Sequence, residues 1–184
     1  MDRIIDKAAW PRREIFDFFS GISNPFYAVT FRQDVTELRN YCKERKISFY
    51  YGLIYLCCKA LQDVPAFACR IRGENVVELG EQKPSFTDLK KGSELFHIVT
   101  MPCEGSIVEF CGKAREVTAV TNERELLAPN ARDDSIPRIC WGKYTLENDR
   151  VYLGISVEVN HRLIDGVHIG RFAEALTRRI QALK

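Results

Sequence analysis

The sequence predicts an α/β fold in which a single domain, residues 1–184, packs helices against a mixed β-sheet as a two-layer sandwich. The length of 184 residues and the hydrophobic content of 46% fit one compact domain with a sizeable core. Segments with helical periodicity interleave with alternating, strand-like segments, but not in strict β-α-β order. No repeat or linker divides the chain, so we expect one folding unit.

Five segments predict helices. In the first helix, Pro11 is suited to the first turn and Gly21 to the C-terminal end. Thr36 is a candidate N-terminal cap for the second helix. The third segment is apolar nearly all round, which predicts a buried helix, and the fourth has less regular apolar spacing. The expected helices span residues 11–22, 34–46, 48–64, 105–127 and 166–183.

The expected strands are rich in aromatic and β-branched residues and alternate between two faces. They cover residues 24–35, 85–89 and 94–102. A hairpin is expected at 65–80, turning at Gly73, Glu74 and Asn75, and two strands at 138–159, joined by a Glu-Asn-Asp turn. Residues 128–138, rich in Pro, Asn and Asp, predict a loop.

Composition excludes several classes of function. With 27 basic and 25 acidic residues the net charge is only +2, so we expect neither nucleic-acid nor membrane partners. Residues 1–14 are charged and lack the apolar stretch of a signal peptide, and no run is long enough to span a membrane. We therefore expect a cytoplasmic protein whose seven cysteines are reduced and mostly buried, with no metal site, because no CxxC pair occurs.

The stretch "VNHRLIDGVHIGRF", residues 159–172, raises a question of function. His161 follows an alternating strand, at a strand end where functional side chains commonly project, and an imidazole can take and return a proton near neutral pH. A structural interpretation stays open: His161 would be an ordinary turn residue, Asp165 a helix cap, and Gly166 a turn residue with φ above 0°. The local spacing alone favours the structural interpretation, because a motif with three fixed positions is weak evidence for catalysis.

Blocks spread along the chain resemble the chloramphenicol acetyltransferase family. They are "WPRREIFDFF", "ISFYYGLIYLCCKAL", "RIRGENVVELGEQKPSFT", "GKYTLENDRVYLGISVEV" and "HRLIDGVHIGRF", in the family's order. The last block also resembles, less closely, the catalytic domains of dihydrolipoyl acyltransferases. Order along the chain is far more specific than the short histidine motif.

This resemblance implies a CoA-dependent O-acetyltransferase that works as a homotrimer with active sites between subunits. His161 would deprotonate a small hydroxyl-bearing acceptor, which attacks acetyl-CoA directly without an acyl-enzyme. Asp165 and Arg12 would form a largely buried ion pair that holds the histidine loop. Lys143 would lie near the CoA site, and the acceptor would be lined by Phe18, Phe19, Tyr27, Phe96 and Cys140.

The chain also departs from the family's pattern. It lacks the P-W-x-x-F-x-S strand whose serine stabilises the oxyanion, and Ser135 is the only serine nearby. Cys140 stands where the family has a threonine, and Asn160 where drug-modifying members have a second histidine. These losses make chloramphenicol doubtful as the acceptor.

Two other functions therefore stay open. The first is a non-catalytic trimeric binding or scaffold protein, which the missing serine favours. The second is acyl transfer to lipoyl-type thiols. The sequence shows no attached lipoyl domain, which counts against this function.

Overall fold

The computed structural model describes residues 1–89, 92, 94, 96–120 and 133–183. Its helices are α1 (Arg13–Ser20), α2 (Thr36–Arg45), α3 (Phe49–Gln62), α4 (Ile107–Val120) and α5 (Gly166–Gln181), with a 3₁₀ turn at Pro65–Ala68. Its strands are β1 (Arg3–Ile4), β2 (Phe26–Asp34), β3 (Cys69–Arg72), β4 (Asn75–Glu78), β5 (Ser85–Leu89), β6 (Phe96–Thr100), β7 (Arg138–Trp141), β8 (Thr145–Glu147) and β9 (Arg150–Asn160).

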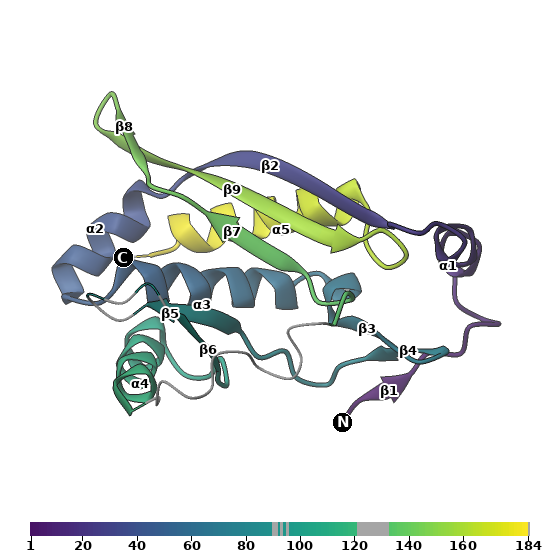
Figure 1. The fold of residues 1–184 in the computed structure, drawn as a ribbon. Helices are drawn as coiled ribbons and strands as arrows, with labels where there is room; N and C mark the ends of the chain where they lie inside the picture. The colour runs from purple at the N-terminus through teal and green to yellow at the C-terminus, as the bar shows by residue number, and fades with distance from the viewer. Residues whose placement is uncertain (90–91, 93, 95, 121–132, 184) are drawn as a thin grey trace.

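The largest sheet runs in the order β2-β9-β7, with β8 also paired to β9, and helices α3 and α5 cover one of its faces (Figure 1). Strand β9 alternates: Val151, Leu153, Ile155, Val157 and Val159 are all buried against these helices. The even-numbered positions of β2 and of β9 up to Glu158 alternate to the opposite face, which no described helix or second sheet covers, whereas Asn160 at the end of β9 is buried. The expected α/β class with layered sheet and helices is confirmed.

The strand directions differ from the expected mixed sheet. All pairings among the described strands are antiparallel, and the strands form three sheets: β2-β9-β7 with β8, β1-β4-β3, and β5-β6. Short turns join β3 to β4 and β8 to β9, and such turns permit only antiparallel pairing. The two turns predicted from the sequence indicated the antiparallel pairs β3 with β4 and β8 with β9, but the interleaving of helices and strands did not reveal the direction of the other pairings.

The register of β2 on β9 positions the end of the sheet that matters for function. Phe26 pairs with Asn160 and Asp34 with Tyr152, so the two strands match over nine positions. The backbone N–H of His161 then donates to the carbonyl of Pro25 at 2.7 Å, one step beyond the last pair. The chain that leads from α1 into β2 is thereby fixed beside His161.

Most element boundaries agree with the sequence prediction to within a few residues. The segment 138–159 is an exception, because the chain leaves the sheet at 142–144 and forms three strands in place of two. The turn before β9 has Asn148 and Asp149 at positive φ, as expected for a tight hairpin. The end of the predicted fourth helix, 121–127, and part of the predicted loop, 128–132, lie outside the described residues.

Thr36 is the first residue of α2 and does not cap it. The cap position belongs to Val35, and the Thr36 hydroxyl donates to Asp34 Oδ1 at 2.6 Å while accepting the N–H of Val151 at 2.9 Å. The hydroxyl therefore ties the helix start to β9. By contrast, Ser48 caps α3 through the N–H of Tyr51.

All seven cysteines are free thiols, and Cys140 alone among them is exposed. Within the described ranges, no three His, Cys, Asp or Glu side chains converge as they would around a metal ion. Of the helices that the structure describes, none has the length and apolar character that crossing a membrane requires.

Candidate active site around His161

His161 lies in a tight loop, residues 160–165, between β9 and α5; this segment is called the His161 loop below. The N–H groups of Leu163 and Ile164 both donate to the carbonyl of Asn160, at 3.0 and 3.1 Å, which closes the turn. The side chains of Leu163 and Ile164 are fully buried in the main core. Two apolar anchors therefore hold the loop from inside, and His161 and Arg162 lie on its outer side.

The imidazole of His161 lies between two aromatic rings. The Phe19 centroid, from α1, lies 4.1 Å away, and the Tyr27 ring, from β2, stacks on it at 4.8 Å with planes 20° apart. Its Nε2 atom is 3.3 Å from Oδ1 of Asp165, and 26% of the side chain stays exposed. Two aromatic rings and one carboxylate thus restrain the imidazole, yet it remains accessible.

Arg12 holds the His161 loop through four hydrogen bonds. Its guanidinium donates to both carboxylate oxygens of Asp165, at 2.5 and 2.6 Å, and to the carbonyls of His161 at 2.8 Å and Arg162 at 2.9 Å. The side chain of Arg12 is 11% exposed and that of Asp165 is 30% exposed, so the expected largely buried pair is only partly buried. The hydrogen bonds and charge of Arg12 lower the pKa of Asp165, outweighing the opposing effect of burial.

Asp165 is also the cap residue of α5, as the structural interpretation of the motif expects. The motif alone did not indicate the second capping residue, His168, whose Nδ1 accepts a hydrogen bond from the backbone N–H of Asp165 at 3.0 Å. Burial, followed by the nearby Arg12 charge, lowers the pKa of His168 and favours the neutral ring that this contact needs. The Asp-x-x-His spacing resembles a capping box and was the available signal.

Gly166 has a different role from the one expected. It is not among the glycines with positive φ. A Cβ at this position would lie 3.0 Å from the Tyr27 hydroxyl. Glycine therefore lets the start of α5 approach Tyr27 closely, which helps to fix the ring that stacks on His161.

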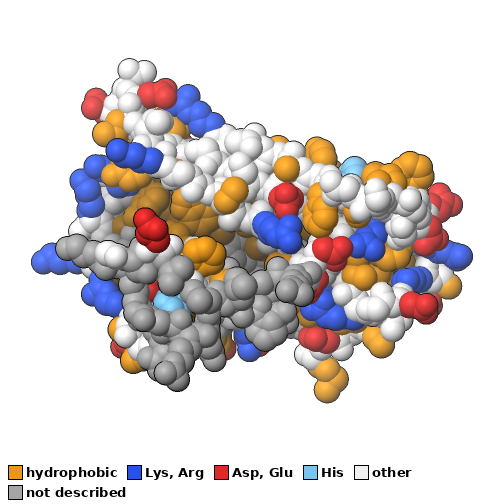
Figure 2. All heavy atoms as spheres, viewed as in Figure 1, with side chains coloured by type: hydrophobic (Ala, Val, Ile, Leu, Met, Phe, Trp, Pro, Cys, Tyr) orange, Lys and Arg blue, Asp and Glu red, His pale blue; other side chains and the backbone are white. Residues whose placement is uncertain are grey.

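The other residues expected around the acceptor and CoA are not all near His161. Phe18 is exposed and packs edge-on against Phe19, with ring centroids 5.0 Å apart, at the α1 end where Figure 2 shows hydrophobic side chains on the surface. Phe96 is exposed on β6, and β6 and the His161 end of β9 lie at different ends of the fold (Figure 1). Cys140 lies on β7, at the edge of the sheet β2-β9-β7, and pairs with Ser156. Within one chain the structure therefore places Phe18, Phe19 and Tyr27 at this end of the fold, but not Phe96 or Cys140.

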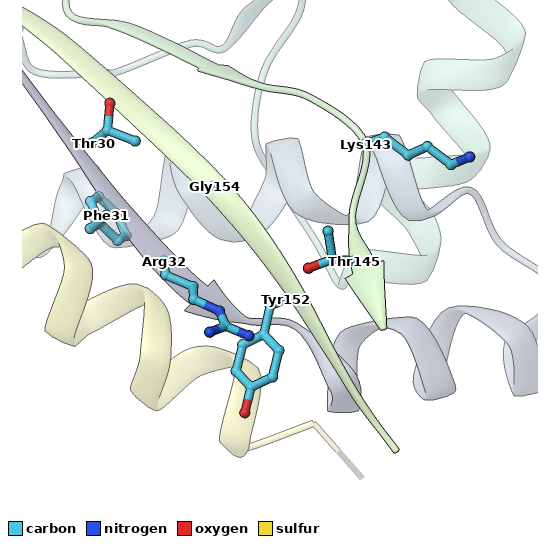
Figure 3. Close-up of a pocket in the computed structure, with 7 residues that line it drawn as sticks. All are labelled: Thr30, Phe31, Arg32, Lys143, Thr145, Tyr152 and Gly154. Carbon is cyan, nitrogen blue, oxygen red and sulfur yellow. The ribbon is translucent and has the colours of Figure 1, made fainter. Parts of the chain in front are cut away.

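Lys143 lies at a shallow hollow of about 310 Å³ on the outer face of the sheet, and His161 is not among the residues that line it (Figure 3). The guanidinium of Arg32 stacks on Tyr152 at 3.7 Å there and pairs with Glu147, so its charge is already matched. The Lys143 side chain extends away from Arg32 and Tyr152 in Figure 3. The hollow by itself is not an enclosed ligand site.

Ser135 is not a free hydroxyl donor. It is fully buried, and its Oγ donates to Asp133 Oδ1 at 2.5 Å while its N–H donates to the same oxygen at 2.9 Å. This closed turn uses the serine proton. Ser135 therefore does not replace the missing oxyanion serine in this arrangement.

Comparison with known proteins identifies the family. The chloramphenicol acetyltransferase family profile matches residues 2–139 and 125–177. Among curated relatives, chloramphenicol acetyltransferase 2 of Escherichia coli is 26% identical over 199 aligned residues, covering 94% of this chain and 93% of the relative. The enzyme of Clostridium perfringens is 25% identical, with 97% and 98% covered.

Solved structures show the same fold. A chloramphenicol acetyltransferase superposes with a TM-score of 0.87 at 22% identity, covering all of both chains. A probable dihydrolipoamide acetyltransferase from Listeria monocytogenes gives 0.63 at 13% identity, with 93% of this chain and 90% of that one covered. Because the family profile spans most of the sequence, the chain belongs to the chloramphenicol acetyltransferase family.

Proposed function

We propose that this protein is a CoA-dependent O-acetyltransferase that uses His161 as general base toward a small hydroxyl-bearing acceptor. The observation that carries the proposal is the support given to one accessible imidazole. Arg12 fixes both the loop carbonyls and the Asp165 carboxylate, and Asp165 faces His161 Nε2. A capped helix alone would not need this arrangement around a partly exposed ring.

The proposed chemistry is a direct transfer. With Nε2 facing the carboxylate, the other imidazole nitrogen is left to accept the acceptor's hydroxyl proton. The acceptor oxygen attacks the thioester carbonyl carbon of acetyl-CoA as that proton moves. The tetrahedral intermediate then expels the CoA thiolate, which takes the proton back from the imidazolium. No external acid or metal ion is required, and His161 ends in its starting state.

We further propose that the working unit is a homotrimer with sites between copies. Phe96, which the family pattern assigns to the acceptor wall, lies on β6, away from the His161 end of β9 (Figure 1). Cys140, assigned to the same wall, pairs with Ser156 on β9, and Lys143, assigned to acetyl-CoA, lines a hollow whose lining does not include His161. A second copy that lays its β6 and outer sheet face against the His161 end would complete the wall. It would also cover exposed apolar side chains such as Phe18 and Phe96.

A non-catalytic trimeric scaffold remains the second candidate. Ser135 favours it, because its hydroxyl donates to Asp133 and is not free to act as the lost oxyanion donor. Loss of one such donor typically slows acyl transfer by roughly 10²–10³-fold. An enzyme with another acceptor, and slower than drug-modifying relatives, is compatible with the same observation.

The experiment is a transfer assay with acetyl-CoA and a panel of hydroxyl compounds that includes chloramphenicol. Acetylated product should be followed by mass spectrometry, since the exposed Cys140 thiol would interfere with thiol reagents. His161→Ala should lower turnover by roughly 10²–10⁴-fold with little change in acetyl-CoA binding. Undiminished turnover in His161→Ala would refute the base, and no turnover by the parent protein with any acceptor would favour the scaffold.

A further inference from the structure

Arg162, which follows the proposed base, takes part in a polar group that the proposed chemistry does not use. Its Nε and its backbone N–H both donate to Oδ1 of Asn160, at 3.0 and 3.1 Å. Its Nη2 donates to Oδ2 of Asp134 at 3.0 Å, and Asn160 Nδ2 reaches the Asp134 carbonyl at 3.5 Å. The side chains of Asn160, Arg162 and Asp134 are called the Arg162 clamp.

The clamp is most buried at its end nearest the His161 loop. Asn160 is 2% exposed, so its amide depends on protein partners for its hydrogen bonds, and Arg162 supplies two of them. Arg162 itself is mostly buried, whereas Asp134 is about half exposed at the rim. A charged, planar donor that bridges an amide and a carboxylate fixes geometry more strictly than one contact does.

The far end of the clamp is itself anchored. Asp133, the neighbour of Asp134, accepts from Arg72 Nη1 of β3 at 2.5 Å and closes the turn through Ser135. Two consecutive aspartates are thus each held by a different arginine, one on β3 and one in the His161 loop. Asp134 is therefore a fixed point for Arg162.

The peptide around His161 is consequently held from two sides. Arg12 binds the carbonyls of His161 and Arg162, and the clamp binds the side chain of Arg162 and its N–H. Fixing the residues on both sides of His161 sets the direction of its Cα–Cβ bond, and hence where the imidazole points between Phe19 and Tyr27. Misplacing a reacting group by 1 Å can cost about 100-fold in rate.

We propose that the Arg162 clamp is a positioning device for His161, with Arg162 as its positioning residue and Asp134 as its anchor. The proposal rests on the proposed acetyl transfer for its kinetic consequence. It predicts that loss of the clamp changes how the ring is held and lowers kcat, while acetyl-CoA affinity is kept.

The test compares Arg162→Met and Asp134→Asn with a matched control, Arg179→Met. Arg179 forms a two-bond pair with Asp63, at 2.7 and 2.9 Å, near the other end of α5. The chain has three histidines, so the imidazole NMR signals of His161 can be assigned by loss in His161→Ala. These signals and the steady-state constants are recorded for each variant.

Both clamp variants should shift or split the His161 signals and lower kcat by roughly 10- to 100-fold, with the KM for acetyl-CoA within about twofold of the parent. Arg179→Met should change neither the His161 signals nor kcat. Asp134→Asn is nearly isosteric at a half-exposed position, so it provides a result if Arg162→Met fails to fold. His161 signals in the clamp variants that superpose on the parent's, or shifted signals with unchanged kcat, would overturn the proposal. If the parent protein has no turnover, the proposed function fails, and unchanged signals would still overturn the clamp by themselves.

Discussion

Replacing Arg12 by methionine is expected to lower the free energy of unfolding by about 3 kcal/mol. The change keeps the aliphatic stem but removes four donated hydrogen bonds. Each of the two loop carbonyls left without a donor costs about 1 kcal/mol, the low end of the usual range. Asp165 is 30% exposed and can be hydrated once Arg12 is removed. Loss of the ion pair therefore adds about 1 kcal/mol, a cost between those of a surface and a buried ion pair.

Thermal and urea unfolding measure this change, at one fixed protein concentration because assembly would alter apparent stability. A loss of about 3 kcal/mol corresponds to a fall in Tm of roughly 6–12 °C for a chain of this size. The matched control is Arg13→Met, the adjacent arginine, which is exposed and pairs with Asp17 at 3.6 Å. It should cost less than about 1 kcal/mol.

A double-mutant cycle with Asp165→Asn isolates the pair, because asparagine can still cap α5. We expect a coupling energy of at least about 1 kcal/mol at pH 7. The folded pKa of Asp165 lies below its ordinary 3.8, so the stabilisation is present above that value and is lost as pH falls through the folded pKa. Additive effects at pH 7, or equal losses in Arg12→Met and Arg13→Met, would refute the reasoning.

Three further predictions concern other parts of the molecule. Burial lowers the pKa of His168 below 6.5, so its contribution to stability is present above pH 6.5 and is lost as pH falls below that value. His168→Gln should therefore reduce the difference in unfolding free energy between pH 7.5 and pH 5.5, measured by urea unfolding. An equal difference in the parent protein and the variant would contradict this prediction. In the native protein a thiol reagent should modify Cys140 first, because Cys140 is exposed and the other six cysteines are buried. Burial also raises the pKa of Cys42 to about 11 and of Cys57 to about 12. A fast phase of modification that persists in Cys140→Ser would show the assignment to be wrong. Light scattering after size-exclusion chromatography should give three times the mass of one chain, and a monomer would remove the proposed interfacial site.

Local chemistry made the fold largely predictable. The last helix was predicted at 166–183 and is found at Gly166–Gln181, because its cap and its apolar spacing both lie in the sequence. Strand pairing is another matter: β2 pairs with β9 across more than 110 residues, and no local pattern specifies that register. The break at 142–144 was missed because the residues on both sides suit a strand equally well.

The candidate site was predictable only in part. Arg12, Asp165 and His161 came from an ordered resemblance, and their contacts depend on a loop that Arg12 reaches from 150 positions away. Asn160 was noted only as a departure from the family pattern, and Arg162 and Asp134 were not singled out. These residues are linked only by contacts in three dimensions, and the sequence does not show which charged residues will meet.

The separation of His161 at the end of β9 from Phe96 on β6 has a genetic consequence. If each site takes its base from one copy and this part of its wall from another, His161→Ala and Phe96→Ala damage opposite sides of an interface. Two such chains, each inactive alone, would complement one another when refolded together. With random assembly of equal amounts, about a quarter of the sites would draw an intact base and an intact wall from different chains. Activity recovered in the mixture would then belong to neither chain but to their assembly.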